Sequence, residues 1–192
     1  MRRWGTALAA LTLAGAGLVT AAGTAGAATG EATGTKAAAA CSTAWGSANK
    51  TSPDTFYKPL GNIRTGQHDC YDRMVFDIPG ASAGKVGYHV GYVDKFYQDG
   101  SGEPIPVNGG AILQIFVGAP SYNPADGSVV YPGQAGQPLP GVNIAGYQTF
   151  KDTRFGASFE GQTQVAVGTR ARLPFRVLQS GDQLIVDVAH TW

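Results

Sequence analysis

Three arginines late in the chain have a spacing that can place their charges on one face of a strand. Arg170, Arg172 and Arg176 occupy even positions, and apolar residues occupy the odd positions around them. Residues two apart on a strand project the same way, about 7 Å apart. Guanidinium groups in such a row can pair with carboxylates or phosphates. The spacing predicts a binding row for an anionic polymer or, alternatively, a solvated positive face, and Pro174 indicates an edge strand.

Tyrosines and one aspartate are further candidates for contact with a ligand. Tyr88 and Tyr92 share one face of another predicted strand, where their rings can stack on sugars or pack in the core. Asp72 shares its parity with Met74 and Phe76, so we expect it on an apolar face, where an unpaired charge is costly. Asp72 therefore needs either a structural partner or a ligand.

Catalytic patterns are weak. Residues 80–84 match the G-x-S-x-G motif, and Ser82, Asp187 and His190 follow the chain order of an α/β-hydrolase triad. That motif requires a strand that leads into a helix, whereas small residues here connect two predicted strands. The carboxylates form no spaced pair of the kind that glycoside hydrolysis needs. We assign no catalytic residue and keep a small secreted hydrolase as an alternative.

The residue types that bind metals are scattered. The three histidines show no ligand spacing. Asp99, Ser101 and Glu103 alternate across a glycine-rich turn and can offer oxygens to calcium, but Asp-Gly-Ser-Gly is also ordinary turn chemistry. We expect no metal and no cofactor.

These side chains need strands to position them, and beyond residue 60 the apolar period is two. The predicted strands are Tyr71–Ile78, Val86–Phe96, Ile105–Val107, Ala111–Val117, Tyr147–Asp152, Gln162–Val167, Ala171–Leu178 and Leu184–Ala189. Asn108–Gly109 indicates a tight hairpin, so the first four segments are expected to form a meander. The last two are expected to form a closing hairpin around residues 179–182.

The stretch between these two groups of strands is a predicted long loop. Residues 118–146 contain 6 Gly and 5 Pro, a density that excludes regular structure through most of the stretch. No helix is predicted that would cover a parallel sheet. We therefore expect a single all-β domain at residues 56–192, folded as an antiparallel β-sandwich.

The beginning of the chain has the features of an exported protein. Arg2 and Arg3 precede an uncharged Ala/Leu/Gly stretch and an A-x-A cleavage site, which predicts a signal peptide at residues 1–27 and no membrane span. Residues 28–55 read as a flexible lead-in. Cys41 and Cys70 are expected to pair in an oxidising compartment, and closing this loop is worth about 3.6 kcal/mol.

The charge balance excludes one class of partner. The chain has 192 residues, 14 Lys and Arg against 13 Asp and Glu, and a net charge of +1. That charge changes sign once the two leader arginines are removed. Binding to nucleic acid depends on excess positive charge, so we expect no nucleic-acid partner. The sequence does not indicate an oligomeric state.

The order of several motifs resembles a known family. Tyr71–Gly80, Gly100–Pro104, Pro174–Leu178 and Leu184–Val188 are similar to the AMIN-like domain of secreted actinobacterial proteins, a group that is itself similar to the AMIN domain. The resemblance covers Gly61–His190. It implies a β-sandwich that targets proteins to the periplasm or wall, in the AMIN case by binding peptidoglycan, without catalysis.

The resemblance and the residues together predict a non-catalytic module of the cell envelope. Its expected partner is peptidoglycan or another wall glycan or anionic wall polymer. A protein-interaction module is the second alternative beside the hydrolase, and the loop at residues 118–146 is the first segment to test for it.

Overall fold

Alternating apolar residues fold the chain into strands that begin earlier than the sequence indicates. The computed structural model describes residue 41 and residues 44–53 and 58–192. The expected signal peptide at residues 1–27, most of the expected lead-in at 28–55 and the expected domain start at Phe56 lie outside this part. Strand β1 (Lys50–Ser52) lies inside it and pairs with β4 (Tyr88–Val93), so the first sheet includes residues ahead of Phe56.

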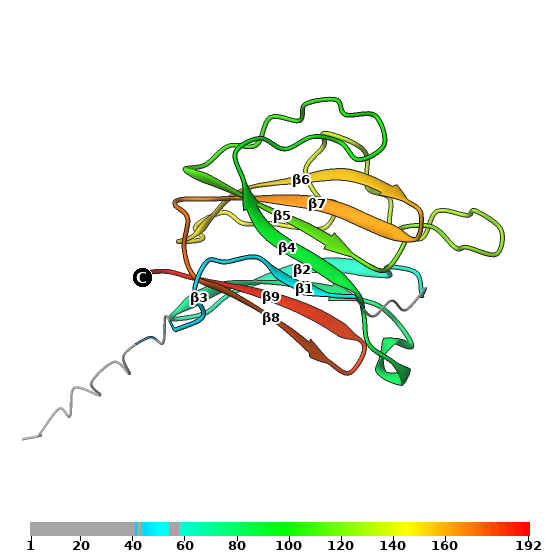
Figure 1. The fold of residues 1–192 in the computed structure, drawn as a ribbon, viewed down its shortest axis with the longest axis horizontal. Helices are drawn as coiled ribbons and strands as arrows, with labels where there is room; N and C mark the ends of the chain where they lie inside the picture. Colours follow the sequence, from blue (N-terminus) through cyan, green and yellow to red (C-terminus); the bar gives the residue numbers. More distant parts are fainter. Residues whose placement is uncertain (1–40, 42–43, 54–57) are drawn as a thin grey trace, which may run out of the picture. The chain divides into compact units, whose positions relative to one another are not determined.

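The strands form two antiparallel sheets (Figure 1). The five-stranded sheet has the order β1-β4-β5-β7-β6, with β5 (Ala111–Val117), β6 (Phe150–Phe159) and β7 (Gln162–Thr169). The four-stranded sheet has the order β2-β3-β9-β8, with β2 (Asn62–Gln67), β3 (Tyr71–Asp77), β8 (Phe175–Ser180) and β9 (Gln183–Ala189). The predicted all-β sandwich is confirmed.

The core lies between the two sheets. Met74 and Phe76 of β3 are fully buried, as are Leu113 and Ile115 of β5, and they belong to one hydrophobic cluster. Burying a side chain of this size completely stabilises the fold by about 1.5–3 kcal/mol. The alternation seen in the sequence therefore drives the two inner faces together.

Several predicted elements are confirmed. Strands β3, β5, β7 and β9 lie close to predicted segments, and β8 and β9 form the closing hairpin. Gly181 in the hairpin turn has a φ of 54°, which glycine adopts without strain. Strand β8 is an edge strand, as Pro174 indicates.

The predicted meander is wrong. Strand β3 pairs with β2 and β9, while β4 pairs with β1 and β5, so β3 and β4 lie in different sheets. No strand forms at Ile105–Val107 and no hairpin at Asn108–Gly109. The Asn108 backbone N–H instead donates to Asp152 Oδ2 at 2.9 Å. Alternation identifies the apolar face of a strand, but it does not identify the strand's neighbour.

The long connection between β5 and β6 covers exposed sheet edges. As predicted, residues 118–146 contain no strand and only an isolated bridge between Tyr122 and Val129. The backbone of Phe155 on β6 exchanges hydrogen bonds with this loop. Thr65 on β2 donates to the carbonyl oxygen of Asn143. Covering an edge in this way protects it from pairing with other chains.

The predicted disulfide is present. Cys41 and Cys70 are bonded, with their Cα atoms 5.3 Å apart, and the bond joins residue 41 to the turn before β3. Its bonding is consistent with an extracellular protein. In the part of the chain that the structure describes, no helix has the length and apolarity needed to cross a membrane.

Candidate binding site

The three arginines of the predicted row lie in different surroundings. Strand β8 begins only at Phe175, after Pro174, which has no N–H to donate to the ladder. Arg170 and Arg172 therefore precede the strand. Arg170 donates to the carbonyl oxygen of His190, just after β9, Arg172 lines a pocket, and Arg176 lies on the outer face of the four-stranded sheet. The predicted single row is not formed, because it required the strand to start at residue 171.

Arg176 instead shares a buried carboxylate with Arg73. Arg73 Nε and Nη2 donate to Asp187 Oδ1 and Oδ2 at 2.6 and 2.9 Å, and Arg176 Nε donates to Oδ2 at 2.8 Å. The register explains this, since Asp187 on β9 lies opposite Arg73 on β3 and opposite Arg176 on β8. Asp187 is 0% exposed, while the arginine side chains are 24% and 33% exposed.

Aromatic rings lie beside both guanidinium groups. The Arg176 Cζ is 4.3 Å from the ring centroid of Trp45 and 5.3 Å from that of Tyr71. The Arg73 Cζ is 5.1 Å from the Tyr71 ring, and His68 stacks on Tyr71 with ring centroids 4.5 Å apart. Rings at these distances attract cations and limit how the guanidinium groups turn. We call Trp45, Tyr71, Arg73, Arg176 and Asp187 the arginine site.

The segment that carries Trp45 is held by two hydrogen bonds, one from β8 of the four-stranded sheet and one from Lys50 of β1 in the other sheet. The Phe175 N–H donates to the carbonyl oxygen of Gly46 at 2.9 Å, and Gly46 has a φ of 65°. Lys50 Nζ donates to the carbonyl oxygen of Trp45 at 3.0 Å, and burial lowers the pKa of this amine. The main chain therefore holds the indole ring against β8.

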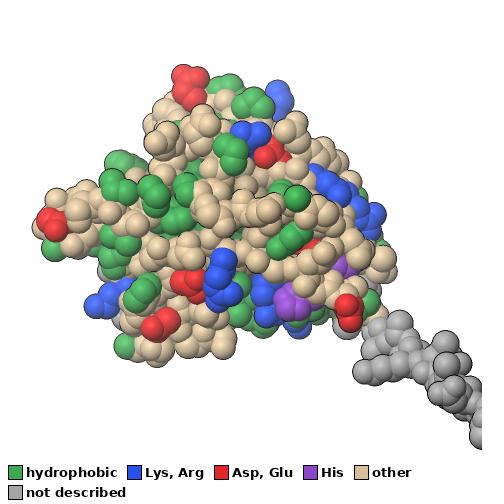
Figure 2. All heavy atoms as spheres, turned by 180° about the vertical axis from the view of Figure 1, so that it is seen from behind, with side chains coloured by type: hydrophobic (Ala, Val, Ile, Leu, Met, Phe, Trp, Pro, Cys, Tyr) green, Lys and Arg blue, Asp and Glu red, His purple; other side chains and the backbone are tan. Residues whose placement is uncertain are grey.

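The charge of the arginine site is positive. Two guanidinium groups face one carboxylate, and the hydrogen bonds that Arg73 donates to Asp187 raise the pKa of Arg73 further. Arg176 contacts Asp187 through Nε, and its terminal nitrogens make no hydrogen bond with the described residues. Lys and Arg side chains also gather beside the histidines on the face shown in Figure 2. The site can therefore offer N–H groups to an anion.

Asp72 lies on the opposite face of β3 and is fully buried. Its Oδ2 accepts hydrogen bonds from the N–H groups of Thr149 and Phe150 at 2.6 and 2.9 Å. Its Oδ1 has no hydrogen-bond partner among the described residues and lies 3.8 Å from His190 Nε2. The expected structural partners are present, so we leave Asp72 out of the proposed binding surface.

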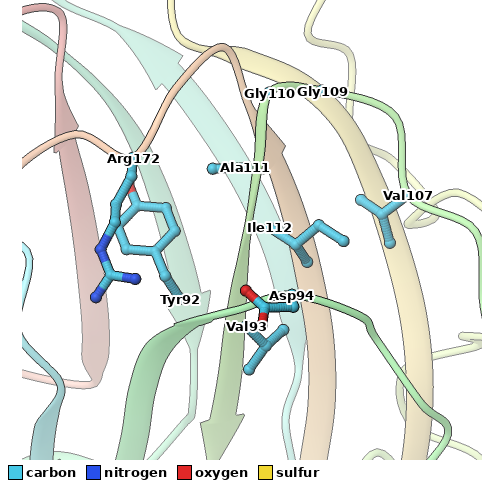
Figure 3. A pocket seen from close by; sticks show the side chains of 9 residues that line it. All are labelled: Tyr92, Val93, Asp94, Val107, Gly109, Gly110, Ala111, Ile112 and Arg172. Atoms are coloured by element: carbon cyan, nitrogen blue, oxygen red, sulfur yellow. The ribbon is translucent and has the colours of Figure 1, made fainter.

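The two candidate tyrosines are both partly buried. Tyr88 packs against the core. The Tyr92 hydroxyl donates to the carbonyl oxygen of Leu173 at 2.8 Å and accepts from the Leu173 N–H at 3.0 Å, and burial raises the pKa of this phenol. Arg172 Cζ lies 5.3 Å from the Tyr92 ring, and both residues line a pocket (Figure 3).

The residues of the apparent hydrolase triad are not brought together. Ser82 lies in a 3-10 turn, Ala81–Ala83, and its N–H donates to Asp182 Oδ1 at 2.7 Å. This hydrogen bond places Ser82 near the start of β9. His190 follows the end of β9, and the two ends of the strand are about 20 Å apart. Asp187 is occupied by the two arginines. No three His, Cys, Asp or Glu residues among those described are grouped to hold a metal ion.

Sequence reasoning did not single out the arginine site. Tyr71 and Arg73 share one parity, which is a local signal for a common face. Asp187, the partner of Arg73, lies 114 residues from it in the sequence. Nothing in the alternation of apolar residues indicates that β3 and β9 pair. Trp45 lies in an Ala/Thr/Gly/Ser-rich segment that reads as a lead-in. The site therefore depends on strand register and on a contact with a distant segment.

Comparison with known proteins gives a match to a family model. The family model described as the AMIN-like domain matches residues 58–190. This range contains strands β2 to β9 and four residues of the arginine site, Tyr71, Arg73, Arg176 and Asp187; Trp45 precedes it. No curated protein and no solved structure matches the chain.

Proposed function

The chain belongs to the AMIN-like domain family, and from this membership we propose that it is a non-catalytic binding module of the cell envelope. Its proposed partner is peptidoglycan or another anionic wall polymer. Family membership supports an association with peptidoglycan. The choice of the arginine site as the contact surface comes from the geometry of this chain.

The observation that carries the proposal is the sharing of one buried carboxylate by two partly exposed arginines. Asp187 orients Arg73 and Arg176 but neutralises only one of their two charges. Arginine pairs with carboxylates and phosphates through two parallel N–H groups. Trp45 and Tyr71 add aromatic surface on which sugar rings can stack. Carboxylates or phosphates next to sugars are the chemistry of an anionic wall polymer.

Export is part of the proposal. The predicted signal peptide directs the chain out of the cytoplasm. The Cys41–Cys70 bond suits an oxidising compartment. The disulfide also holds residue 41 next to the strand that carries Tyr71 and Arg73, so oxidation supports the same surface.

We propose no catalytic residue, because the surroundings of Ser82, His190 and Asp187 do not suit a catalytic triad. A nucleophilic serine needs a base within hydrogen-bond reach, and Ser82 and His190 belong to opposite ends of β9. The Asp187 carboxylate, which would orient such a base, is bonded to two arginines.

A sedimentation assay tests the proposed function. The purified protein, from about residue 28 onward, is mixed with insoluble peptidoglycan and sedimented, and the supernatant is assayed for released muropeptides. We expect saturable pelleting without release. The variant Arg73→Gln/Arg176→Gln should bind at least about tenfold more weakly, because two charge-assisted contacts are lost.

A matched control comes from the same face of the same sheet. Arg64 pairs with Asp77 at 2.9 Å, and its side chain is 48% exposed, so Arg64→Gln removes one surface cation without touching the arginine site. Its pelleting should equal that of the wild type. Absence of pelleting, or release of muropeptides, would contradict the proposal. Equal loss in the control would contradict the choice of site.

A further inference from the structure

A second site lies at the end of the five-stranded sheet, away from the Asp187 carboxylate. A pocket of about 500 Å³ is formed by the ends of β4 and β5 and by the segments that precede β5 and β8. This volume lies within the range of about 300–1,000 Å³ that is typical of ligand pockets. In Figure 3, Arg172 and Tyr92 lie on one side, Val107 lies on the other, and Asp94 and Ile112 lie between them.

The pocket contains two opposite charges that do not pair with each other. Among the described residues, neither Arg172 nor Asp94 forms an ion pair. Arg172 reaches only the carbonyl oxygen of Ser47, at 3.5 Å, and lies over the Tyr92 ring. Both charged groups are exposed and available to a ligand.

The cationic end of the pocket is held in place. The Tyr92 hydroxyl bonds to both backbone groups of Leu173, which fixes the ring. The guanidinium of Arg172 lies over this ring, and among the described residues it donates only the long hydrogen bond from Nη2 to Ser47 O, so its other N–H groups remain for a ligand. Such a stacked arginine suits the bidentate recognition of a carboxylate.

The middle and the far side of the pocket combine a carboxylate with aliphatic surface. Asp94 can accept hydrogen bonds from an ammonium group, which carries three N–H donors. Val107 and Ile112 provide apolar contact beside it. A polymer with only negative charges would be repelled by Asp94, and a neutral sugar would leave both charges unpaired.

The loop that forms the rim of the pocket is closely packed on β7. A Cβ at Gly110 would overlap the carbonyl oxygen of Arg170, and Gly109 has a φ of 141°. The Gly110 N–H donates to Thr169 O at 2.8 Å. The rim is therefore anchored to the sheet, so a ligand meets a formed pocket.

We propose that this pocket binds a short peptide with free ends, whose carboxylate pairs with Arg172 and whose ammonium pairs with Asp94. The aliphatic part of the peptide contacts Val107 and Ile112. This site is separate from the arginine site and does not depend on wall binding there. The protein would then have two proposed ligands, a wall polymer at the arginine site and a short peptide at this pocket.

The test uses trialanine with free ends, its N-acetyl derivative and its C-terminal amide as probes. Binding is followed by the NMR shifts of backbone amides in the folded protein. We expect trialanine to shift the amides of Gly109, Gly110 and Ala111. Blocking either end should weaken binding about tenfold, because one charge-assisted contact is lost.

Two variants assign the contacts. Asp94→Asn should weaken trialanine binding about tenfold and remove the effect of N-acetylation, while Arg172→Gln should remove the effect of amidation. Asp99→Asn and Arg64→Gln are the charge-matched controls and should bind as the wild type does. The proposal is overturned if millimolar trialanine shifts no amide at the pocket, or if blocked and free peptides bind equally. Wall pelleting, measured in the same variants, reports separately on the arginine site.

Discussion

Two buried aspartates on neighbouring strands of one sheet have opposite tasks. Asp72 on β3 faces the interior between the sheets and accepts hydrogen bonds from two main-chain N–H groups. Asp187 on β9 faces outward and accepts from two arginine side chains. Both carboxylates are 0% exposed.

The two carboxylates differ in the groups that donate hydrogen bonds to them. The partners of Asp72 belong to the main chain at the start of β6, so the aspartate connects the two sheets. The partners of Asp187 are long side chains that reach solvent, so the aspartate positions a surface. Burial alone therefore does not distinguish a carboxylate that holds the main chain from one that orients surface side chains, whereas the identity of the hydrogen-bond donors does.

The largest expected effect follows from replacing Asp72. Asp72→Ala leaves the N–H groups of Thr149 and Phe150 buried without partners, which should lower the free energy of unfolding by about 4 kcal/mol. Urea denaturation measures this. Asp69→Ala, an exposed change three residues away, should stay within about 0.5 kcal/mol of the wild type. A similar loss of unfolding free energy in both variants would contradict the structural role assigned to Asp72.

Removal of the disulfide should have the next largest effect. Cys41→Ser/Cys70→Ser opens the loop between residues 41 and 70 and should cost about 3.6 kcal/mol in the chain-entropy model. Because the disulfide joins residue 41 to Cys70, next to Tyr71 of the arginine site, wall pelleting should weaken as well. Reduction of the wild-type protein with dithiothreitol should reproduce the denaturation result. Unchanged stability in both samples would contradict the prediction.

Replacement of Asp187 should cost less than that of Asp72. Asp187→Asn removes the charge shared by Arg73 and Arg176, but these arginines are partly exposed and water can solvate them. We expect a loss of about 2 kcal/mol, measured by denaturation. Asp77→Asn, which alters the more exposed pair with Arg64, should cost less than about 1 kcal/mol. A loss at Asp187 equal to that at Asp72 would refute the distinction.

The smallest expected effect depends on pH and involves a third aspartate. Hydrogen bonds from the Ser82 side chain and from the N–H groups of Gly80 and Ser82 lower the pKa of Asp182 from 3.8 to about 2. A lowered pKa in the folded state stabilises the protein above pH 3.8, and this contribution is lost as the pH falls toward 2.

Asp182→Asn tests this contribution. The melting temperature of the wild type should exceed that of the variant at pH 7 and approach it at about pH 2. Asp182 is not fully buried, so the difference should be smaller than for Asp72, although both carboxylates accept main-chain N–H groups. Asp99→Asn, in another turn, serves as the control. A gap that widens on acidification would contradict the prediction.

Much of the fold is predictable from local patterns. The period of two identifies β3 from Met74 and Phe76, and the Gly and Pro density identifies the loop at residues 118–146. Two cysteines in a chain with a predicted leader allow one internal bond, which is present between Cys41 and Cys70. The partners of each strand are not predictable in the same way, because alternation specifies a face and contains no information about the neighbouring strand.

The candidate site is only partly predictable. Arg172 and Tyr92 are found by residue type, and they meet at the pocket. Arg176 is also identified by residue type, but Arg170 and Arg172, its expected neighbours in the row, do not lie beside it on the strand. Its partner Asp187 is 11 residues away and is shared with Arg73, far earlier in the chain.

The sequence by itself determined the β-class, the apolar face of most strands, the disulfide and the need of Asp72 for a partner. Most of these properties depend on residues that are close in the sequence. The disulfide depends only on there being two cysteines, which can form one internal bond. Only the tertiary structure decided that β3 lies between β2 and β9, which places Arg73, Asp187 and Arg176 side by side. The physical reason is that pairing and register depend on how two complete inner faces pack, and that packing involves residues more than a hundred positions apart.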